Sequence, residues 1–308
     1  CTCLPANPTI TVKAWSSTDN SVAVDISSAR ATAIELYTAS GTKFTTINAA
    51  SGTHTFRHNA PQNNGSYYVR VKNAKGYNTG SFPFTVSTLD VAAPVITGKV
   101  QPGNSVWAAS KTLTVTATDK TNVAFSLRYA DGSAVPGCPD KAGTASGGAF
   151  TATWVLTEQL ASTKTFKIIA SDKWGYTSET TIAVSCIDGQ KPSKPSISLS
   201  DIGDWHKEAV TVTISGGSST SGITYYQYRM DGGAWQTGST VIISAEGIHT
   251  VEAKAISHAG LESDIVGTTV KLDPGWVDNG SRDHNPDPRR CGRIGIGQRY
   301  PAGWPHGI

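Results

Sequence analysis

The fold is decided by three stretches of similar pattern: YYVRVKNAKGYNTGSFPFTVSTLD (Tyr67–Asp90), FKIIASDKWGYTSETTIAVSCID (Phe166–Asp188) and HTVEAKAISHAGLESDIVGTTVKLD (His249–Asp273). Each begins with apolar residues at alternate positions, which is the pattern of a half-buried β-strand. In every stretch a glycine lies three positions after a polar residue, and a second strand-like run ends at an aspartate. Because glycine is favoured where a tight turn requires positive φ, each stretch is predicted to be a hairpin. The turns are expected at Gly76, Gly175 and Gly260.

The chain that leads to the first hairpin also consists of short strand-like runs. Helical periodicity is nearly absent, and β-branched and aromatic residues alternate with Gly, Pro, Asn, Asp and Ser. The first unit is expected to contain seven strands, with the spacing typical of a β-sandwich. They are Thr9–Trp15, Ser21–Ile26, Ala33–Thr38, Lys43–Asn48, Thr53–His58, Ser66–Asn73 and Gly80–Ser87.

The hairpin repeats at a long interval. The three turn glycines are 99 and 85 residues apart, which is too long for a solenoid and suits separate domains in tandem. We therefore expect an all-β fold: three tandem Ig-like β-sandwiches with an irregular C-terminal tail. Short linkers that contain Pro94, Pro192 and Pro195 predict stiff joints and a rod of roughly 110 Å. The predicted boundaries are an arm at 1–8, domains at 9–90, 91–188 and 189–273, and a tail at 274–308.

The composition excludes several classes of protein. The chain has 308 residues, a formal net charge of +3 and 16% charged residues, so a nucleic-acid binder with a basic stripe is not expected. No run approaches the apolar length of a transmembrane helix, about 18 residues or more. A single methionine, together with abundant Thr, Ser, Val and Gly, favours an extracellular β protein.

The third unit carries a recognisable pattern. It contains DWHKEAVTVTISGG, ITYYQYRMDGGAWQTG and ISAEGIHTVEAKAISHAG within Asp204–Gly260. These residues resemble the bacterial Ig-like repeats of Gram-positive surface and secreted proteins, which carry a D-G-G-x-W hairpin and an E-G-x-H/Y-T-V strand. The first two units resemble Ig-like or fibronectin type III-like modules through the shared final hairpin, as in NNGSYYVRVKNAKG (Asn63–Gly76). The resemblance implies an extracellular spacer, adhesive or polymer role, and no single activity.

The five cysteines carry the most informative chemistry. An odd number in an extracellular protein leaves one thiol unpaired or bonded to another molecule. Cys138 and Cys186 are expected at one pole of the second domain, where an intradomain disulfide is geometrically reasonable. Cys1, Cys3 and Cys291 lie at the two ends of the predicted rod and are candidates for intermolecular disulfides in a head-to-tail filament. Two alternatives stay open: Cys1 is the lipidated cysteine of a bacterial lipoprotein, or Cys1 and Cys3 are both unpaired.

The tail differs from the three units. It is rich in Gly, Pro and Arg, and it has too few apolar residues to bury a core of its own. The alternating stretch Arg293–Gly297 is suited to pairing with an exposed sheet edge as an added strand. Large aromatic residues dominate interface energetics, so tail tryptophans are expected to anchor an assembly. The predicted anchors are Trp276, Ile294, Ile296 and Trp304.

No motif supports catalysis. The sequence has no G-x-S-x-G elbow, no H-E-x-x-H and no phosphate-binding loop between a strand and a helix, so neither an enzyme nor a cofactor is predicted. Asp119, Asp172 and Asp188 lie near turns of the second domain and are the candidates for a calcium site at a domain joint. Because no D-x-[DN]-x-[DN]-G loop is present, the sequence favours no metal site.

These observations together favour a structural role. The chain is expected to be a subunit of an extracellular bacterial fibre or surface assembly, joined end to end, so that its partner is a second copy. The alternative is an adhesin, or a carbohydrate-binding stalk region of a surface protein, with a host or matrix ligand as partner. Both hypotheses place the chain outside the cell or on its surface, and neither requires nucleic acid.

Overall fold

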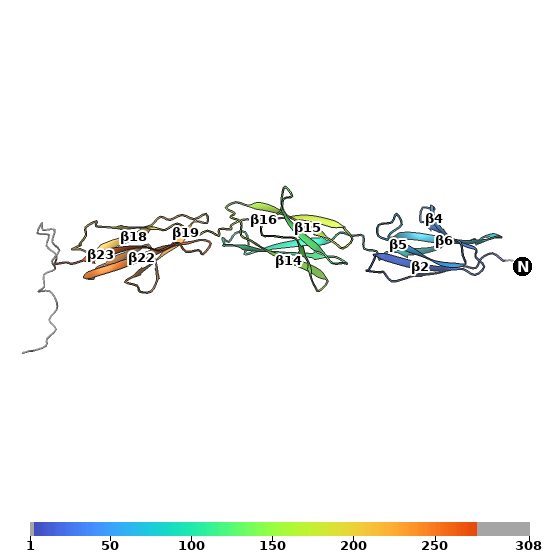
Figure 1. Ribbon diagram of the computed structural model, residues 1–308, viewed down its shortest axis with the longest axis horizontal. Coiled ribbons are helices and arrows are strands. Elements are labelled where there is room, and N and C mark those ends of the chain that lie inside the picture. The colour runs from blue at the N-terminus through green and yellow to red at the C-terminus, as the bar shows by residue number, and fades with distance from the viewer. Residues whose placement is uncertain (1–2, 276–308) are drawn as a thin grey trace, which may run out of the picture.

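The computed structural model describes residues 3–275, which form 23 strands and no helix. The strands build three sandwiches in a row, and the two ends of the described chain lie at opposite ends of this row (Figure 1). Within the described residues, no helix of the length and apolarity needed to cross a membrane is found.

The first sandwich lies at the N-terminal end of the row. Its strands are β1 (Thr9–Val12), β2 (Ser21–Ser27), β3 (Ala33–Thr38), β4 (Lys43–Ile47), β5 (Ser51–Arg57), β6 (Gly65–Asn73), β7 (Gly76–Tyr77) and β8 (Phe82–Val86). One sheet has the order β1-β2-β5 and the other β4-β3-β6-β7, with β8 also paired to β6. All of these pairs are antiparallel.

The second sandwich lies in the middle of the row. Its strands are β9 (Val95–Gln101), β10 (Lys111–Thr118), β11 (Ala124–Tyr129), β12 (Lys141–Ala142), β13 (Thr144–Ser146), β14 (Ala149–Leu156), β15 (Lys164–Ser171) and β16 (Thr177–Val184). One sheet has the order β13-β14-β10-β9, and the other has the order β12-β11-β15-β16.

The third sandwich completes the row. Its strands are β17 (Ser196–Leu199), β18 (Val210–Ser215), β19 (Ile223–Met230), β20 (Gln236–Thr237), β21 (Thr240–Ile243), β22 (Gly247–Ser257) and β23 (Val266–Leu272). One sheet has the order β17-β18-β21, and the other has the order β20-β19-β22-β23.

The three sandwiches share one strand order. In each, the first two strands pair with each other, and the second also pairs with the strand that precedes the final hairpin. The third strand pairs with the first strand of that hairpin and with a short edge strand. This is the order of Ig-like and fibronectin type III-like sandwiches, so the prediction of an all-β Ig-like fold is confirmed. The seven strands predicted for the first unit correspond to β1–β6 and β8.

Each sandwich has its own apolar core. In β10, the alternate residues Leu113, Val115 and Ala117 are fully buried, while the threonines between them are half-buried. Burying an aliphatic side chain such as Leu113 contributes roughly 1.5–3 kcal/mol. The indole of the buried Trp154 donates a hydrogen bond of 2.8 Å to the Pro139 carbonyl, so the largest side chain of this core is also satisfied.

The three hairpin turns adopt the conformation that their glycines predict. The φ angles of Gly76, Gly175 and Gly260 are 123°, 90° and 78°. A side chain at positive φ is strained, which explains why glycine stands at the same place in each repeat. One of these turns matters for function, because Asp172, the polar residue three positions before Gly175, lies where the first sandwich meets the second.

Candidate functional site

Buried polar side chains gather at both junctions between sandwiches. At the first, Asn20 is fully buried and binds the backbone of Asp90 at both polar groups. Its Nδ2 donates to the Asp90 carbonyl at 2.7 Å, and its Oδ1 accepts from the Asp90 N–H at 2.8 Å. This paired contact holds the last residue of the first sandwich against the loop that precedes β2, so the direction of the linker is fixed.

Side chains of the second sandwich reach back to the first across this junction. Lys120 donates to the Thr88 carbonyl at 2.5 Å, and Lys173 donates to the Ser17 carbonyl at 3.1 Å. The rings of His58 and Trp174 lie 5.1 Å apart. The junction is therefore bonded from several directions and is more than a single connecting strand.

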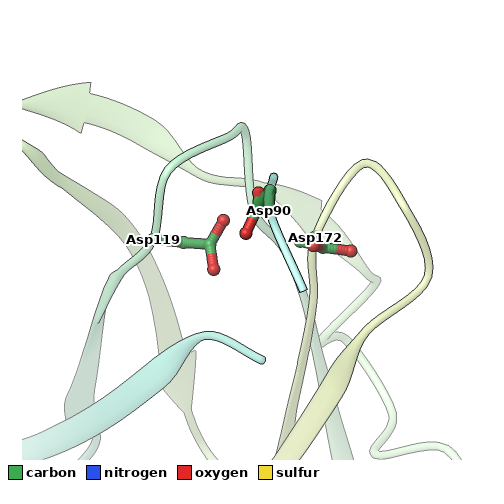
Figure 2. Close-up of side chains that lie close together, drawn as sticks. All are labelled: Asp90, Asp119 and Asp172. Atoms are coloured by element: carbon green, nitrogen blue, oxygen red, sulfur yellow. The ribbon is translucent and has the colours of Figure 1, made fainter. Parts of the chain in front are cut away.

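Three carboxylates meet at this first junction (Figure 2). Asp90 stands where the first sandwich ends, Asp119 directly follows β10, and Asp172 directly follows β15. One carboxylate oxygen from each lies within 4.8 Å of the other two. The structure therefore brings together two of the three aspartates that the sequence singled out for calcium. The third, Asp188, lies at the other end of the second sandwich.

Sequence reasoning missed Asp90 as a member of this group. It was visible as the terminal aspartate of the first hairpin, but it was interpreted only as a domain boundary. The missing step was spatial: the end of one sandwich meets the β10–β11 loop and the β15–β16 turn of the next. The prediction that the chain holds no metal is not tested by these contacts.

The hydrogen bonds to the three carboxylates are incomplete. Asp172 Oδ1 accepts from the N–H groups of Trp174 and Tyr176, both at 2.8 Å. Asp119 Oδ1 accepts from the Thr121 N–H at 2.9 Å, and Asp90 Oδ2 accepts from the Thr121 hydroxyl at 3.3 Å. Two buried side-chain atoms of the described chain have no partner, Asp172 Oδ2 and Trp174 Nε1, and both lie at this junction.

Charge is only partly compensated at this junction, where Lys120 is the nearby positive charge that acts on Asp90. Among residues 3–275, no lysine, arginine or histidine forms an ion pair with Asp90, Asp119 or Asp172. Burial, followed by the nearby charges of Asp119 and Asp172, raises the pKa of the Asp90 carboxyl above its usual value. A shallow pocket of about 350 Å³ opens beside Asp90 and Asp119.

At the second junction, a single aspartate is well supplied with donors. The carboxylate of Asp188 is fully buried and accepts hydrogen bonds from the Ser219 hydroxyl, the Ser221 N–H and Gln159 Nε2. Burial by itself would favour the neutral acid, but these donors outweigh it and lower the pKa of Asp188 to about 2. This carboxylate is therefore ionised and satisfied without any cation.

The linker of the second junction is also held on both sides. The Ser193 N–H donates to the Ser218 carbonyl at 2.9 Å, and the Ser218 N–H donates to Ser193 Oγ at 2.8 Å. Gln159 of the second sandwich donates to Thr220 Oγ1 at 2.6 Å, so it bridges Asp188 to the third sandwich.

The cysteines of the second sandwich are both free thiols in this structure, so the predicted intradomain disulfide is not formed. Cys138 is a core residue whose burial raises the pKa of its thiol. Cys186 stands at φ 59° in the segment after β16, where its carbonyl accepts from the Ala108 N–H. Each thiol is thus placed by its own local contacts. Cys3 is exposed at the N-terminal end of the row.

The remaining predicted site residues cannot be placed. Those that lie outside the described residues are Cys1, Trp276, Cys291, Ile294, Ile296 and Trp304. Among the residues that are described, no tryptophan or phenylalanine side chain is exposed. The exposed tyrosines are Tyr77 and Tyr225, which belong to different sandwiches, so they do not form one aromatic face.

Comparison with known proteins adds structural likenesses. No known protein family and no curated protein matches the sequence. Domains A168–A170 of titin share 12% identity, with 88% of this chain and 99% of that chain covered and a TM-score of 0.36. The fibronectin(III)-like modules of Clostridium thermocellum CbhA share 16% identity, with 57% and 95% covered and a TM-score of 0.29.

A tandem-repeat structure is also similar. The tetra-tandem repeat in the extending region of a large adhesion protein shares 15% identity, with 87% of this chain and 74% of that chain covered and a TM-score of 0.29. The three are described as domains, modules or repeats. The Ig-like fold of this chain is assigned from its own strand order.

Proposed function

We propose that this chain is a structural spacer of an extracellular bacterial fibre or surface assembly. The observation that carries the proposal is the linear row of three sandwiches whose two junctions are both bonded from each side (Figure 1). A flexible array would need neither the buried Asn20–Asp90 contact nor the Ser193–Ser218 pair. A row with fixed joints keeps its two ends apart, which is what a spacer must do.

End-to-end assembly follows from the same shape. The N-terminal end of the row, with the exposed Cys3, lies opposite the end at which β23 stops. A contact between unlike ends of such a rod propagates into an open filament unless it closes into a ring. Disulfides through Cys1, Cys3 and Cys291 would make this contact covalent, and the tail beyond the third sandwich would serve as the clamp.

The test is electrophoresis and negative-stain microscopy of the native material, with and without reductant. We expect a ladder, or material retained in the well, that collapses to one monomer band on reduction, together with filaments one sandwich wide. A single monomer band in both lanes and an absence of filaments would contradict assembly.

The second candidate function is a carbohydrate-binding stalk or adhesin. Sugar binding by such a sandwich usually uses a platform of exposed aromatic rings, and the exposed tyrosines of the described chain stand in different sandwiches. This arrangement supports the spacer over the glycan binder. Saturable binding of the purified monomer on a glycan array would reverse the preference.

A further inference from the structure

We propose that the first junction is a calcium site in which Asp90, Asp119 and Asp172 bind one ion between the first two sandwiches. The inference does not depend on filament assembly. It rests on the geometry of the three carboxylates, on a buried oxygen without a partner, and on the charge balance at this junction (Figure 2).

The spacing suits calcium. Oxygen ligands lie about 2.3–2.6 Å from Ca²⁺, so two ligands on opposite sides of the ion are roughly 4.6–5.2 Å apart. The three carboxylate oxygens lie within 4.8 Å of one another, which is no wider than the span of one calcium coordination sphere. The group contains only carboxylates, with no thiol or imidazole, and such hard oxygen ligands favour Ca²⁺ over zinc or copper.

Asp172 supplies the observation that points to a ligand. Its side chain is 7% exposed, and its Oδ2 has no hydrogen-bond partner. Oδ1 is committed to the N–H groups of Trp174 and Tyr176 in its own turn, so Oδ2 is the oxygen left for the cluster. A buried carboxylate oxygen without a donor is strongly unfavourable, and a cation bound by all three aspartates removes the penalty.

The two lysines next to these aspartates in sequence are directed elsewhere. Lys120 donates to the Thr88 carbonyl and lies over the Trp15 ring, 5.1 Å from its centroid. Lys173 donates to the Ser17 carbonyl and lies over the Trp174 ring, 4.7 Å from its centroid. Both ammonium groups therefore hold the sandwiches together without pairing with the carboxylates, which leaves room for a divalent cation.

The site is reachable and can be completed by water. The pocket of about 350 Å³ is lined by Asp90 and Asp119 and gives solvent a route to these two residues. Calcium takes six to eight oxygen ligands, so bidentate carboxylates and water would complete the sphere. We expect an affinity in the range of extracellular modules, with Kd of about 10⁻⁴–10⁻³ M.

The placement gives the ion a mechanical consequence. Asp90 belongs to the end of the first sandwich, whereas Asp119 and Asp172 belong to two loops of the second. An ion bound by all three joins the sandwiches across their linker and cancels the repulsion between the carboxylates. Calcium would therefore stiffen the first junction and leave the second unchanged.

The experiment is terbium titration of the full chain, with excitation of tryptophan and displacement by Ca²⁺. Terbium replaces calcium at oxygen sites, and Trp174 belongs to the same turn as Asp172, so it is the tryptophan expected to sensitise the emission. We expect saturable emission that Ca²⁺ displaces at about 1 mM, while Mg²⁺ at the same concentration does not, because Mg²⁺ requires a smaller sphere and dehydrates reluctantly. Emission that calcium does not displace, or that magnesium displaces equally, would overturn the assignment.

Two variants and a matched control make the test specific. Asp119→Asn and Asp172→Asn each remove one ligand charge, and we expect each to weaken calcium binding about tenfold or more. Asp264→Asn makes the same charge change at the exposed Lys191–Asp264 pair of the second junction, and it should bind like the parent chain. Circular dichroism confirms that each variant is folded. Equal binding by all three folded variants would overturn the proposal.

Discussion

The two junctions of this rod place an aspartate at the same position of the repeat and treat its charge in opposite ways. Asp188 ends the second hairpin and meets hydroxyl, amide and N–H donors, so it is a satisfied anion with a pKa lowered to about 2. Asp90 ends the first hairpin and meets two further carboxylates, and its pKa is raised by burial and by their charges. The neighbours of the residue, and not its place in the repeat, decide whether the junction is complete without a cation.

The difference comes from the loops of the following sandwich. The loop after β10 presents Asp119 and Thr121 to Asp90, whereas the loop after β18 presents Ser219 and Ser221 to Asp188. The hairpin turns differ in a similar way, because the second hairpin has Asp172 at the position where the third has Ser257. At the loop and at the hairpin turn, the second sandwich has a carboxylate where the third has a hydroxyl, so negative charge accumulates at the first junction only.

Removing the aspartate of the second junction should have the largest effect. Asp188→Ala removes the acceptor of the buried Ser221 N–H and of the half-buried Ser219 hydroxyl and Gln159 amide. We expect the free energy of unfolding to fall by about 2–3 kcal/mol. Urea denaturation followed by tryptophan fluorescence measures this, and an effect within the experimental error would mean that the donors find other partners.

The turn glycines offer a matched pair with a smaller cost. Gly175→Ala and Gly260→Ala place a side chain at φ 90° and φ 78°, where no neighbouring atom lies within 4 Å, so the cost is strain alone. Each should destabilise the chain by about 1–2 kcal/mol. Only Gly175→Ala distorts the turn that holds Asp172, so it alone should weaken the calcium response. Equal calcium responses in Gly175→Ala and Gly260→Ala would mean that the conformation of the Asp172 turn does not affect calcium binding.

Neutralising Asp90 should have the opposite sign to neutralising Asp188. In calcium-free buffer, Asp90→Asn removes a buried charge that faces two others, and we expect stabilisation by roughly 1 kcal/mol. Added calcium should stabilise the parent chain and leave this variant unchanged. Thermal melts in chelator and in calcium measure both effects. If Asp90→Asn were less stable than the parent chain in chelator, repulsion among the three carboxylates would not be the dominant effect at this junction.

The pH dependence of the second junction tests the charge of Asp188 separately from the loss of its side chain. Because the folded pKa of Asp188 is depressed, its contribution to stability is present above the usual value of 3.8 and is lost as pH falls toward about 2. The pKa values of Glu35 and Asp19 are also lowered to about 2, so both titrate in the same window. The measured quantity is therefore the difference in unfolding free energy between the parent and Asp188→Asn from pH 5 to pH 2. A difference that does not shrink toward low pH would contradict the assignment.

The fold could be predicted because its signals are local. Alternation in runs such as Leu113, Val115 and Ala117 marks the buried face of a strand, and the glycines of the three hairpins mark turns at positive φ. The state of the cysteines could not be predicted in the same way. An expected position at one pole of the sandwich does not decide whether two cysteines form a disulfide, and Cys138 and Cys186 are free thiols in this structure.

The site could be predicted only in part, for a physical reason. Asp119 and Asp172 follow strands of one sandwich, so proximity to turns was enough to single them out. Asp90 is held beside them by the Asn20 contact, which pairs residues 70 positions apart. Asp188 also lies near a turn in the sequence, as Asp119 and Asp172 do. Its serine donors lie about 31–33 positions further along the chain, so the sequence did not show that this carboxylate is satisfied.

The protein is expected to be a rod of three sandwiches whose first junction is completed by calcium and whose second is complete without it. Small-angle X-ray scattering of the full chain, in calcium and in chelator, tests this expectation. We predict an elongated particle with the cross-section of one sandwich, which is stiffer in calcium than in chelator, and an Asp119→Asn variant that behaves as the chelated parent in both buffers. A compact or sharply folded particle, or an identical calcium response in the parent and in Asp119→Asn, would contradict it.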